Sequence, residues 1–421
     1  MSTRKPSVAL FCALIVMCSI SMVVTSSFTD SYAQTDGNTW YIDASNGNDN
    51  NAGTLEQPWK SISKISVDDV KDGDTVMITG EFSTLGLTKL VRIEAYGDGA
   101  SFSNSAGVRW NSITEDGKPS GTISFVGITF YNMTIQDEGA SSYNLSDVNI
   151  YYENCHFFNK NSAMSLVLYG NYSVEVTNCD FNGTNVDTQN NLYTNSTYAI
   201  FANNCSNLAI NNCVIEDYTR AVNADSIGYL EISDTKISID VTINRGTPDT
   251  EIRQIQIAGT IGDVLIDNIS ISSTVGGNAV SVHETTDDNA HVVLTNSSIS
   301  GFKTGIIYQV ADGTWAQNTV IMANGNYFKD YTGKVSAITA STTDNSVNVS
   351  DFQVINDIFY TNPEMTETNI NNDNQEEESL PPLIPQRSAN NTDVSTYIAC
   401  CAAAAVVALL AIILVMNERK R

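Results

Sequence analysis

The sequence predicts an all-β protein built as a solenoid, a parallel β-helix of stacked coils. Three observations lead to this fold class. A short strand motif ending in Asn or Asp recurs along most of the chain, successive copies are 22 to 34 residues apart, and the apolar positions change parity at each Asn. A repeat of this period made of strands alone indicates a β-helix.

The motif is clearest where Val174 and Val176 are followed by Asn178 and then by Cys179 and Phe181. Alternation up to Val176 is the period of a strand with one buried face. The change of parity predicts a corner at Asn178, because Asn tolerates the left-handed backbone conformation.

Nine copies of the motif are present, and stacking them would bury a continuous core that no single coil can bury alone. Their corner side chains are expected to form a buried hydrogen-bonded ladder, as stacked asparagines do elsewhere. An antiparallel sandwich of short strands is the alternative, but a sandwich does not require Asn at one fixed place. The predicted ladder consists of Asn132, Asn154, Asn178, Asn212, Asp234, Asn268, Asn296, Asn324 and Asn356.

Charge and composition narrow the possible partners. The chain has 21 Lys and Arg against 47 Asp and Glu, for a net charge of -26. This balance argues against a nucleic-acid partner, which requires a basic surface, and against an anionic polymer unless cations bridge the contact. Only 16% of the residues are charged, and the abundance of Asn, Ser, Thr and Gly favours an extracellular surface.

Residues 1–33 have the pattern of a signal peptide. Arg4 and Lys5 precede an apolar run over residues 8–24, and residues 31–33 form a small-x-small cleavage site. An uncleaved membrane anchor is the alternative, because the run is near the lower length limit for a span.

Residues 34–73 contain a distinctive opening motif. It consists of Tyr41-Ile-Asp43, a loop rich in Gly, Asn and Asp, and Pro58-Trp-Lys60, and it leads into Gly73-Asp-Thr-Val76. This motif resembles the N-terminal opening of the right-handed parallel β-helix proteins of the pectate-lyase-like superfamily. Together with the repeats, the resemblance covers about residues 39–361. It implies a right-handed solenoid over residues 74–361 and a short N-terminal cap over its first coil, which would protect an open strand edge.

The C-terminal part changes character twice. Residues 362–393 are acidic and contain several prolines, which predicts a disordered stalk. Residues 394–416 include twenty uncharged, mostly apolar residues, enough for one transmembrane helix. The basic residues 417–421 then predict a cytoplasmic C-terminus and an extracellular solenoid.

Three cysteines, Cys155, Cys179 and Cys213, each follow a corner residue. They are expected to stack in one column, where neighbours about 4.8 Å apart lie within range for a disulfide. Packing as small apolar core residues is the alternative that we favour.

Metal ligands are sparse. His283-Glu284 and the segment from Asp287 to His291 lie close together in sequence but lack a His-Glu-x-x-His spacing. A calcium loop over residues 43–49 would have Asp43, Asn46 and Asp49 as oxygen ligands, but it lacks the closing Glu of an EF-hand. No cofactor and no metal residue is therefore assigned, although calcium remains an open possibility.

No catalytic residue is assigned either. The resemblance implies carboxylate-bound calcium with an Arg or Lys base for a lyase, or clustered aspartates with Gly-His-Gly for a hydrolase. None of the hydrolase motifs occurs, and the Lys and Arg residues of the repeats are scattered. A catalytic site assembled from residues of several coils would show no motif in the sequence.

Asn-x-Ser/Thr sequons are frequent. Those at Asn132, Asn268 and Asn296 fall on corners expected to be buried, which would make them poor acceptors of N-linked glycans. The better candidates lie in loops or in the stalk: Asn144, Asn171, Asn182, Asn195 and Asn390.

The sequence thus predicts a single-pass cell-membrane protein with its β-helix outside the cell, serving adhesion or the binding of extracellular polysaccharide without catalysis. Two other functions remain open. One is an anchored polysaccharide lyase or glycoside hydrolase, and the other is a passive glycosylated coat component.

Overall fold

The computed structural model describes residues 37–360, apart from several internal segments. The segments outside the description are 105, 114–118, 132–134, 139–142, 159–163, 184–196, 241–251, 260, 284–290, 303, 311–319, 330–337, 343–351 and 356–357. The predicted signal, stalk, transmembrane and tail segments therefore lie outside the described residues, as do Asn132, Asn195, Asn356 and Asn390.

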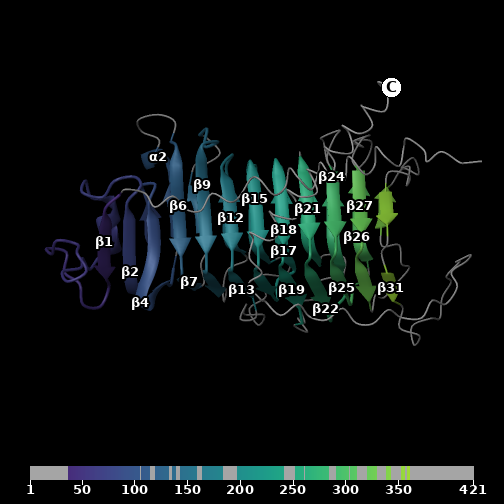
Figure 1. Cartoon of the computed structure of the whole chain (residues 1–421), viewed down its shortest axis with the longest axis horizontal. Coiled ribbons are helices and arrows are strands. Elements are labelled where there is room, and N and C mark those ends of the chain that lie inside the picture. Colours follow the sequence, from purple (N-terminus) through teal and green to yellow (C-terminus); the bar gives the residue numbers. More distant parts are fainter. Residues whose placement is uncertain are drawn as a thin grey trace, which may run out of the picture. The chain divides into compact units, whose positions relative to one another are not determined.

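The described strands form a solenoid in which each regular coil contributes one strand to each of three faces (Figure 1). Every strand pairing among the described residues is parallel, which confirms the predicted parallel solenoid and is incompatible with an antiparallel sandwich. Two single helical turns, η1 (Ile62–Ser66) and α2 (Trp110–Ile113), accompany the strands.

Face 1 contains the strand that precedes each corner. Its strands, in stacking order, are β1 (Thr39–Asp43), β2 (Thr75–Phe82), β4 (Arg92–Phe102), β6 (Gly121–Val126), β9 (Val148–Glu153), β12 (Ser173–Thr177), β15 (Asn207–Asn211), β18 (Tyr229–Ser233), β21 (Asp263–Asp267), β24 (His291–Thr295), β27 (Val320–Asn324) and β30 (Phe352–Ile355).

Face 2 contains the short strand that follows each corner. Its strands are β7 (Ile128–Tyr131), β10 (His156–Phe158), β13 (Asp180–Asn182), β16 (Val214–Glu216), β19 (Lys236–Ile239), β22 (Ser270–Ser273), β25 (Ser298–Ser300), β28 (Tyr327–Lys329) and β31 (Ile358–Tyr360). Strand β4 is long enough to pair with both β6 and β7, so the first coils run from face 1 to face 2 in one strand.

Face 3 is a separate ten-stranded sheet. Its strands are β3 (Leu85–Leu87), β5 (Ala106–Arg109), β8 (Ile135–Glu138), β11 (Met164–Tyr169), β14 (Tyr198–Asn203), β17 (Arg220–Asp225), β20 (Arg253–Ala258), β23 (Asn278–His283), β26 (Thr304–Val310) and β29 (Ile338–Thr342).

The corner residues adopt the left-handed conformation, with φ between 50° and 55° at Asn154, Asn178, Asn212, Asp234, Asn268 and Asn296. The strand register places Gly127 (φ 67°) and Gly325 (φ 70°) at the equivalent positions of their coils. A positive φ is what this corner requires, and Gly satisfies it as well as Asn does.

Two corner predictions are therefore displaced. Asn324 pairs with Thr295, so it lies at the end of β27, one residue before the corner at Gly325. The copy that begins at Ile128 lies after the corner, because β7 pairs with β10 of face 2. The corner of this coil is Gly127. The residues from Ile128 onward match the motif only because strands of face 1 and face 2 both alternate between inward and outward side chains.

The prediction that the corner side chains are buried is also wrong. Asn154, Asn178, Asn212, Asp234, Asn268 and Asn296 are all exposed. Hydrogen bonds nevertheless link some neighbours along the column, from Asn212 Nδ2 to Asn178 Oδ1 (2.6 Å) and from Asn268 Nδ2 to Asp234 Oδ1 (2.5 Å). Asn296 Nδ2 donates instead to Asp267 Oδ1 (2.8 Å).

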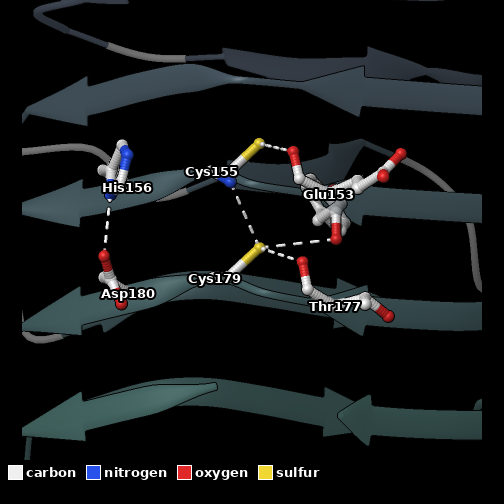
Figure 2. Close-up of polar contacts among 7 residues, drawn as sticks. Glu153, Cys155, His156, Thr177, Cys179 and Asp180 are labelled. Atoms are coloured by element: carbon white, nitrogen blue, oxygen red, sulfur yellow. Dashed lines mark hydrogen bonds and ion pairs between the residues drawn. The ribbon is translucent and has the colours of Figure 1, made fainter. Parts of the chain in front are cut away.

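The residue after each of these corners is buried in the core, and at several of them its side chain accepts a backbone N–H of the neighbouring coil. The Sγ of Cys179 accepts the N–H of Cys155 (3.4 Å) and has the carbonyls of Thr177 and Tyr152 as acceptors at 3.3 and 3.4 Å (Figure 2). In the next coils Thr235 Oγ1 accepts the N–H of Cys213 (3.3 Å) in the same way. Cys155, Cys179 and Cys213 are free and buried, in agreement with core packing rather than a disulfide.

Aromatic rings fill the core behind face 2. Phe102, Phe130, Phe157 and Phe181 stack from coil to coil with ring centroids 5.9, 5.0 and 4.4 Å apart. Isoleucines continue this column in the following coils at Ile215, Ile237, Ile271 and Ile299. Burial of such side chains is worth about 1.5–3 kcal/mol each, so the stack is a main source of stability.

Asp74 explains part of the opening motif. Its carboxylate accepts hydrogen bonds from the N–H groups of Asn38 and Lys71 and from the indole of Trp40, each at 2.8 Å. Trp40 in turn stacks on Trp59 at 4.9 Å. These contacts attach the N-terminal segment to strand β2, where the solenoid begins.

Within the described ranges between residues 37 and 360, we find no helix with the length and apolarity needed to cross a membrane.

Candidate functional site

The residues considered as metal ligands are engaged elsewhere. Asp43 accepts the N–H groups of Ser45 and Asn46 at 2.8 Å. Asp49 accepts the N–H groups of Lys60 and Ser61 at 2.9 and 2.8 Å. Each carboxylate therefore holds a turn, and the described residues contain no group of three or more His, Cys, Asp or Glu that could hold a metal ion.

The two histidines that lie close in sequence are on different faces. His283 is the last residue of β23 on face 3, whereas His291 is the first residue of β24 on face 1 and contacts Asp263 at 2.9 Å. Glu284, Asp287 and Asp288 lie outside the described residues. A third histidine, His156, forms an exposed pair with Asp180 on face 2 at 3.0 Å (Figure 2).

Among the predicted glycosylation residues, Asn144 is exposed, and Asn171 and Asn182 are half-buried. The amide of Asn171 connects two coils, accepting the N–H of Leu145 (2.7 Å) and donating to Asn144 Oδ1 (3.1 Å). A glycan on Asn171 would replace one of its amide hydrogens, so Asn144 is the more accessible acceptor of the pair.

The outer side of face 3 gathers aromatic, cationic and amide side chains from five successive coils. We call this set the face 3 strip, and it extends from β11 through β14, β17 and β20 to β23. At about 4.8 Å per coil, four steps give a length of roughly 19 Å. The strip consists of Tyr169, Tyr198, Phe201, Arg220, Asn223, Arg253, Gln256, Ser281 and His283.

Aromatic rings occupy one end of the strip. The ring of Tyr169 is 5.6 Å from that of Phe201, and Phe201 packs edge-on against Tyr198 at 5.4 Å. Tyr169 is 37% exposed, which is unusual for a large aromatic side chain of this protein. The arrangement presents an apolar surface with phenolic hydroxyls at its edge.

Two arginines follow the aromatic end in adjacent strands. Arg220 and Arg253 each lie two residues before the paired residues Val222 and Ile255, so they are neighbours in one column. The guanidinium of Arg220 lies 5.2 Å from the ring centroid of Tyr198 and donates to its hydroxyl. This cation–π contact holds the guanidinium plane against the aromatic end.

His283 fixes the other guanidinium. Its Nε2 is 2.7 Å from Arg253 Nη1 and 3.0 Å from Ser281 Oγ. Because arginine can only donate, Nε2 must be the acceptor and the ring proton resides on Nδ1. Burial lowers the pKa of His283 to about 4, and the charges of Arg253 and Arg220 act in the same direction.

Polar side chains between these columns are withdrawn from solvent. Asn223 is 6% exposed and Ser281 is fully buried. The Oε1 of Gln256 is sealed from solvent and has no hydrogen-bond donor among the described residues. Leaving such an acceptor unsatisfied costs about 1–3 kcal/mol.

Face 1 carries two glutamates in one outward column. In its outward column Glu175, Ala209 and Glu231 succeed one another. Glu231 accepts the hydroxyl of Tyr229 (3.1 Å), and Glu175 accepts that of Thr177 (3.0 Å).

The environment of Glu231 alters its acidity. Burial raises the pKa of the Glu231 carboxyl, the hydrogen bond from Tyr229 lowers it, and the charges of Asp267 and Glu175 raise it again. The net result is a raised pKa of the Glu231 carboxyl.

Sequence reasoning missed the face 3 strip. Arg220 and Arg253 are 33 residues apart and His283 lies 30 residues further on, so no local motif connects them. The available signal was the first residue of each strand between corners, because Tyr198, Arg220 and Arg253 each begin such a strand.

The sequence matches no protein-family model and no curated protein. Among solved structures, the pectate lyase Pel9A superposes with a TM-score of 0.44 at 11% identity, over 74% of this chain and 82% of that one. The GH136 lacto-N-biosidase from Eubacterium ramulus gives a TM-score of 0.28 at 11% identity, over 76% of this chain and 68% of that one. The fold assignment stands on the parallel register described above.

Proposed function

We propose that the chain is a cell-surface carbohydrate-binding protein whose ligand lies along the face 3 strip. The observation that carries this proposal is the exposed Tyr169, whose ring lies beside that of Phe201 on a strip that also carries guanidinium groups in the following coils. Sugar rings have apolar C–H faces that pack on aromatic rings, and planar amide and guanidinium groups are suited to their hydroxyls. A strip of about 19 Å accommodates several sugar units in a row.

The rest of the proposed organisation comes from the sequence. Residues 1–33 direct secretion, residues 34–73 cap a right-handed solenoid over 74–361, and residues 362–393 hold it away from the membrane. Residues 394–416 anchor the chain, and the basic residues 417–421 remain in the cytoplasm. Right-handed crossovers are nearly universal between parallel strands of one sheet. Adhesion to cells or extracellular polysaccharide then follows from binding, without catalysis or a nucleic-acid partner.

The test compares two exposed tyrosines on different faces. Tyr169→Ala removes the aromatic end of the strip, and Tyr131→Ala removes a ring of similar exposure, 39% against 37%, from face 2. We expect Tyr169→Ala to weaken binding in a glycan array by two- to tenfold, the equivalent of about 0.5–1.5 kcal/mol per aromatic contact. Equal effects of the two substitutions would place the ligand elsewhere.

A glycoside hydrolase on face 1 is the second candidate. Glu175 and Glu231 are two coils apart, about 10 Å along the backbone, with the small side chain of Ala209 between them. Inverting hydrolases use two carboxyls about 6.5–9.5 Å apart, one of them with a raised pKa. Release of new reducing ends by the wild type and its loss in Glu231→Gln would establish this activity. A protein that neither retains nor cleaves any glycan would leave a passive coat component.

A further inference from the structure

We infer that Asn296 carries an N-linked glycan whose first sugar packs against Tyr327. The burial expected from the sequence argued against this sequon. In the structure Asn296 lies on an exposed corner, and Ser298, the third residue of the Asn-x-Ser sequon, is exposed as well. The inference goes beyond the proposed function, because it requires the secretion proposed above but not the binding of carbohydrate by face 3.

The amide of Asn296 is oriented by one hydrogen bond and has a second hydrogen that a sugar can replace. Its Nδ2 donates to Asp267 Oδ1 at 2.8 Å, and Thr295 Oγ1 donates to the same oxygen at 2.7 Å. Nδ2 makes no other hydrogen bond to the described residues. An amide nitrogen has two hydrogens, so a glycan can replace one of them while the bond to Asp267 keeps the side chain in place.

Attachment of the glycan requires a lipid-linked oligosaccharide diphosphate as the sugar donor. A bond forms between Nδ2 of Asn296 and C1 of the first sugar, and the bond between C1 and the diphosphate breaks. Nδ2 loses one proton, and the lipid diphosphate is the leaving group. The protein contributes the sequon and, once folded, the surroundings that accommodate the sugar.

The neighbouring corner leaves room for this sugar. The next coil turns at Gly325, which is exposed and has no side chain. A Cβ at this position would lie 3.3 Å from Asn296 Oδ1, so a larger residue would crowd the amide. Asn268, one coil earlier, is also exposed, but its corner lies between those of Asp234 and Asn296, and its Nδ2 donates to Asp234. The amide of Asn296 is therefore the more open of the two.

An exposed aromatic ring lies within reach of the first sugar. Tyr327 pairs with Ser298 in the strand register, one coil further on and two residues past the corner. At the backbone, the path from Asn296 to Tyr327 is one coil step of about 4.8 Å and two residues of about 3.4 Å each. Tyr327 is 38% exposed, which few large apolar side chains of the described residues are. Sugar C–H faces pack on aromatic rings, so the glycan would cover a ring that the fold leaves open.

The experiment uses the full-length chain, produced in the secretory pathway of yeast or insect cells and purified from membranes in a mild detergent. Peptide mass spectrometry measures the fraction of Asn296 that carries a glycan. Nitration by tetranitromethane measures the accessibility of Tyr327. We expect most chains to be modified at Asn296 and Tyr327 to be protected from nitration.

Variants of Ser298 connect the glycan to this protection. Ser298→Ala removes the sequon and leaves Asn296 in place, whereas Ser298→Thr retains the sequon. We expect Tyr327 to be nitrated at least threefold faster in Ser298→Ala than in wild type or Ser298→Thr. Tyr131 is the matched control, because it is 39% exposed on an earlier coil of the same face, and its rate should be equal in all three proteins. Melting curves verify that each variant is folded.

The outcomes separate the inference from the proposed function. An unmodified Asn296 in chains that carry a glycan at Asn144 or another sequon overturns the inference and leaves the proposed function intact. A modified Asn296 with equal nitration of Tyr327 in wild type and Ser298→Ala overturns the packing on the ring. Chains without a glycan at any sequon overturn both the inference and the secretion on which it rests. Carbohydrate binding by face 3 is tested separately, because Tyr169→Ala leaves the Asn296 sequon unchanged.

Discussion

Among the corner residues, Asn212 allows the sharpest prediction about stability. This residue has a φ of 51°, is exposed, and donates from Nδ2 to Asn178 Oδ1 at 2.6 Å. Two substitutions separate its roles. Asn212→Ala loses the hydrogen bond and forces a Cβ-bearing residue without a polar side chain into the left-handed region, whereas Asn212→Gly loses only the bond and some rigidity.

The magnitudes follow from these contributions. A left-handed conformation costs an ordinary residue about 1–2 kcal/mol, and an exposed side-chain hydrogen bond contributes about 0.5–1 kcal/mol. Asn212→Ala should therefore destabilise by about 2–3 kcal/mol and Asn212→Gly by about 1 kcal/mol. Glycine already fills the same corner at positions 127 and 325, which shows that the site accepts it.

Thermal unfolding of the full-length chain measures the order. We expect wild type to melt highest, then Asn212→Gly, then Asn212→Ala, with roughly 2–4 °C between the two variants. The control is Asn211→Ala, one residue earlier, which loses a hydrogen bond from Ser233 but lies in regular strand β15. If Asn212→Ala melted at the same temperature as Asn212→Gly, the left-handed backbone would not be the reason for Asn at the corner.

The further predictions concern three polar residues that are largely withdrawn from solvent. The unfolded chain takes up a proton at His283 near pH 6.5 and the folded chain only near pH 4, so stability falls as pH decreases through this window. His283→Gln should flatten that dependence by about 1–2 kcal/mol, after allowance for partial exposure, in denaturant titrations at several pH values. Burial raises the pKa of the Cys179 thiol, so iodoacetamide should label it only after unfolding, as peptide mass spectrometry would report. Cys179→Ala should destabilise by about 1–3 kcal/mol, because the N–H of Cys155 loses its acceptor, and Cys179→Ser should recover part of this loss. Asp74→Ala leaves three donors without a partner and should lower the melting temperature and shift the fluorescence of Trp40, whereas an unchanged spectrum would contradict the attachment described above.

The sequence was sufficient for the parallel stack because the corner imposes a local requirement. A positive φ at the described corners selects Asn, Asp or Gly, and the first two form a visible pattern. The same reasoning explains the displaced copies. A search for Asn finds Asn324 and passes over Gly325, although the backbone requirement is met by the glycine.

The exposure of the corner was implicit in the parity shift. Val176 and Cys179 both point inward, so the two residues between them, Thr177 and Asn178, must both point outward. The expectation of a buried ladder followed the analogy with Asn ladders in other proteins rather than this geometry. The buried hydrogen-bonding column is the next one along the chain, where side chains accept backbone N–H groups at Cys179, Thr235, Ser297 and Asn326.

The face 3 strip could not be read from the sequence, because its columns depend on the register between coils. The steps from Tyr198 to Arg220, Arg253 and Asn278 are 22, 33 and 25 residues. Loops of different length absorb these differences, so residues that share a column share no sequence spacing. The corners set the register between coils, and this register determines which outward residues lie next to one another.

The net charge of -26 is also a weak indication of which ligand a given place on the surface can bind. Charges beyond about 8–10 Å are largely screened at physiological ionic strength, and that distance is only two coils of the stack. The potential at any one place on the solenoid is therefore set by the few charges around it rather than by the total. A net charge that opposes a long anionic polymer lying anywhere on the surface therefore does not decide what a single place can bind, because the register between coils determines which charges meet there.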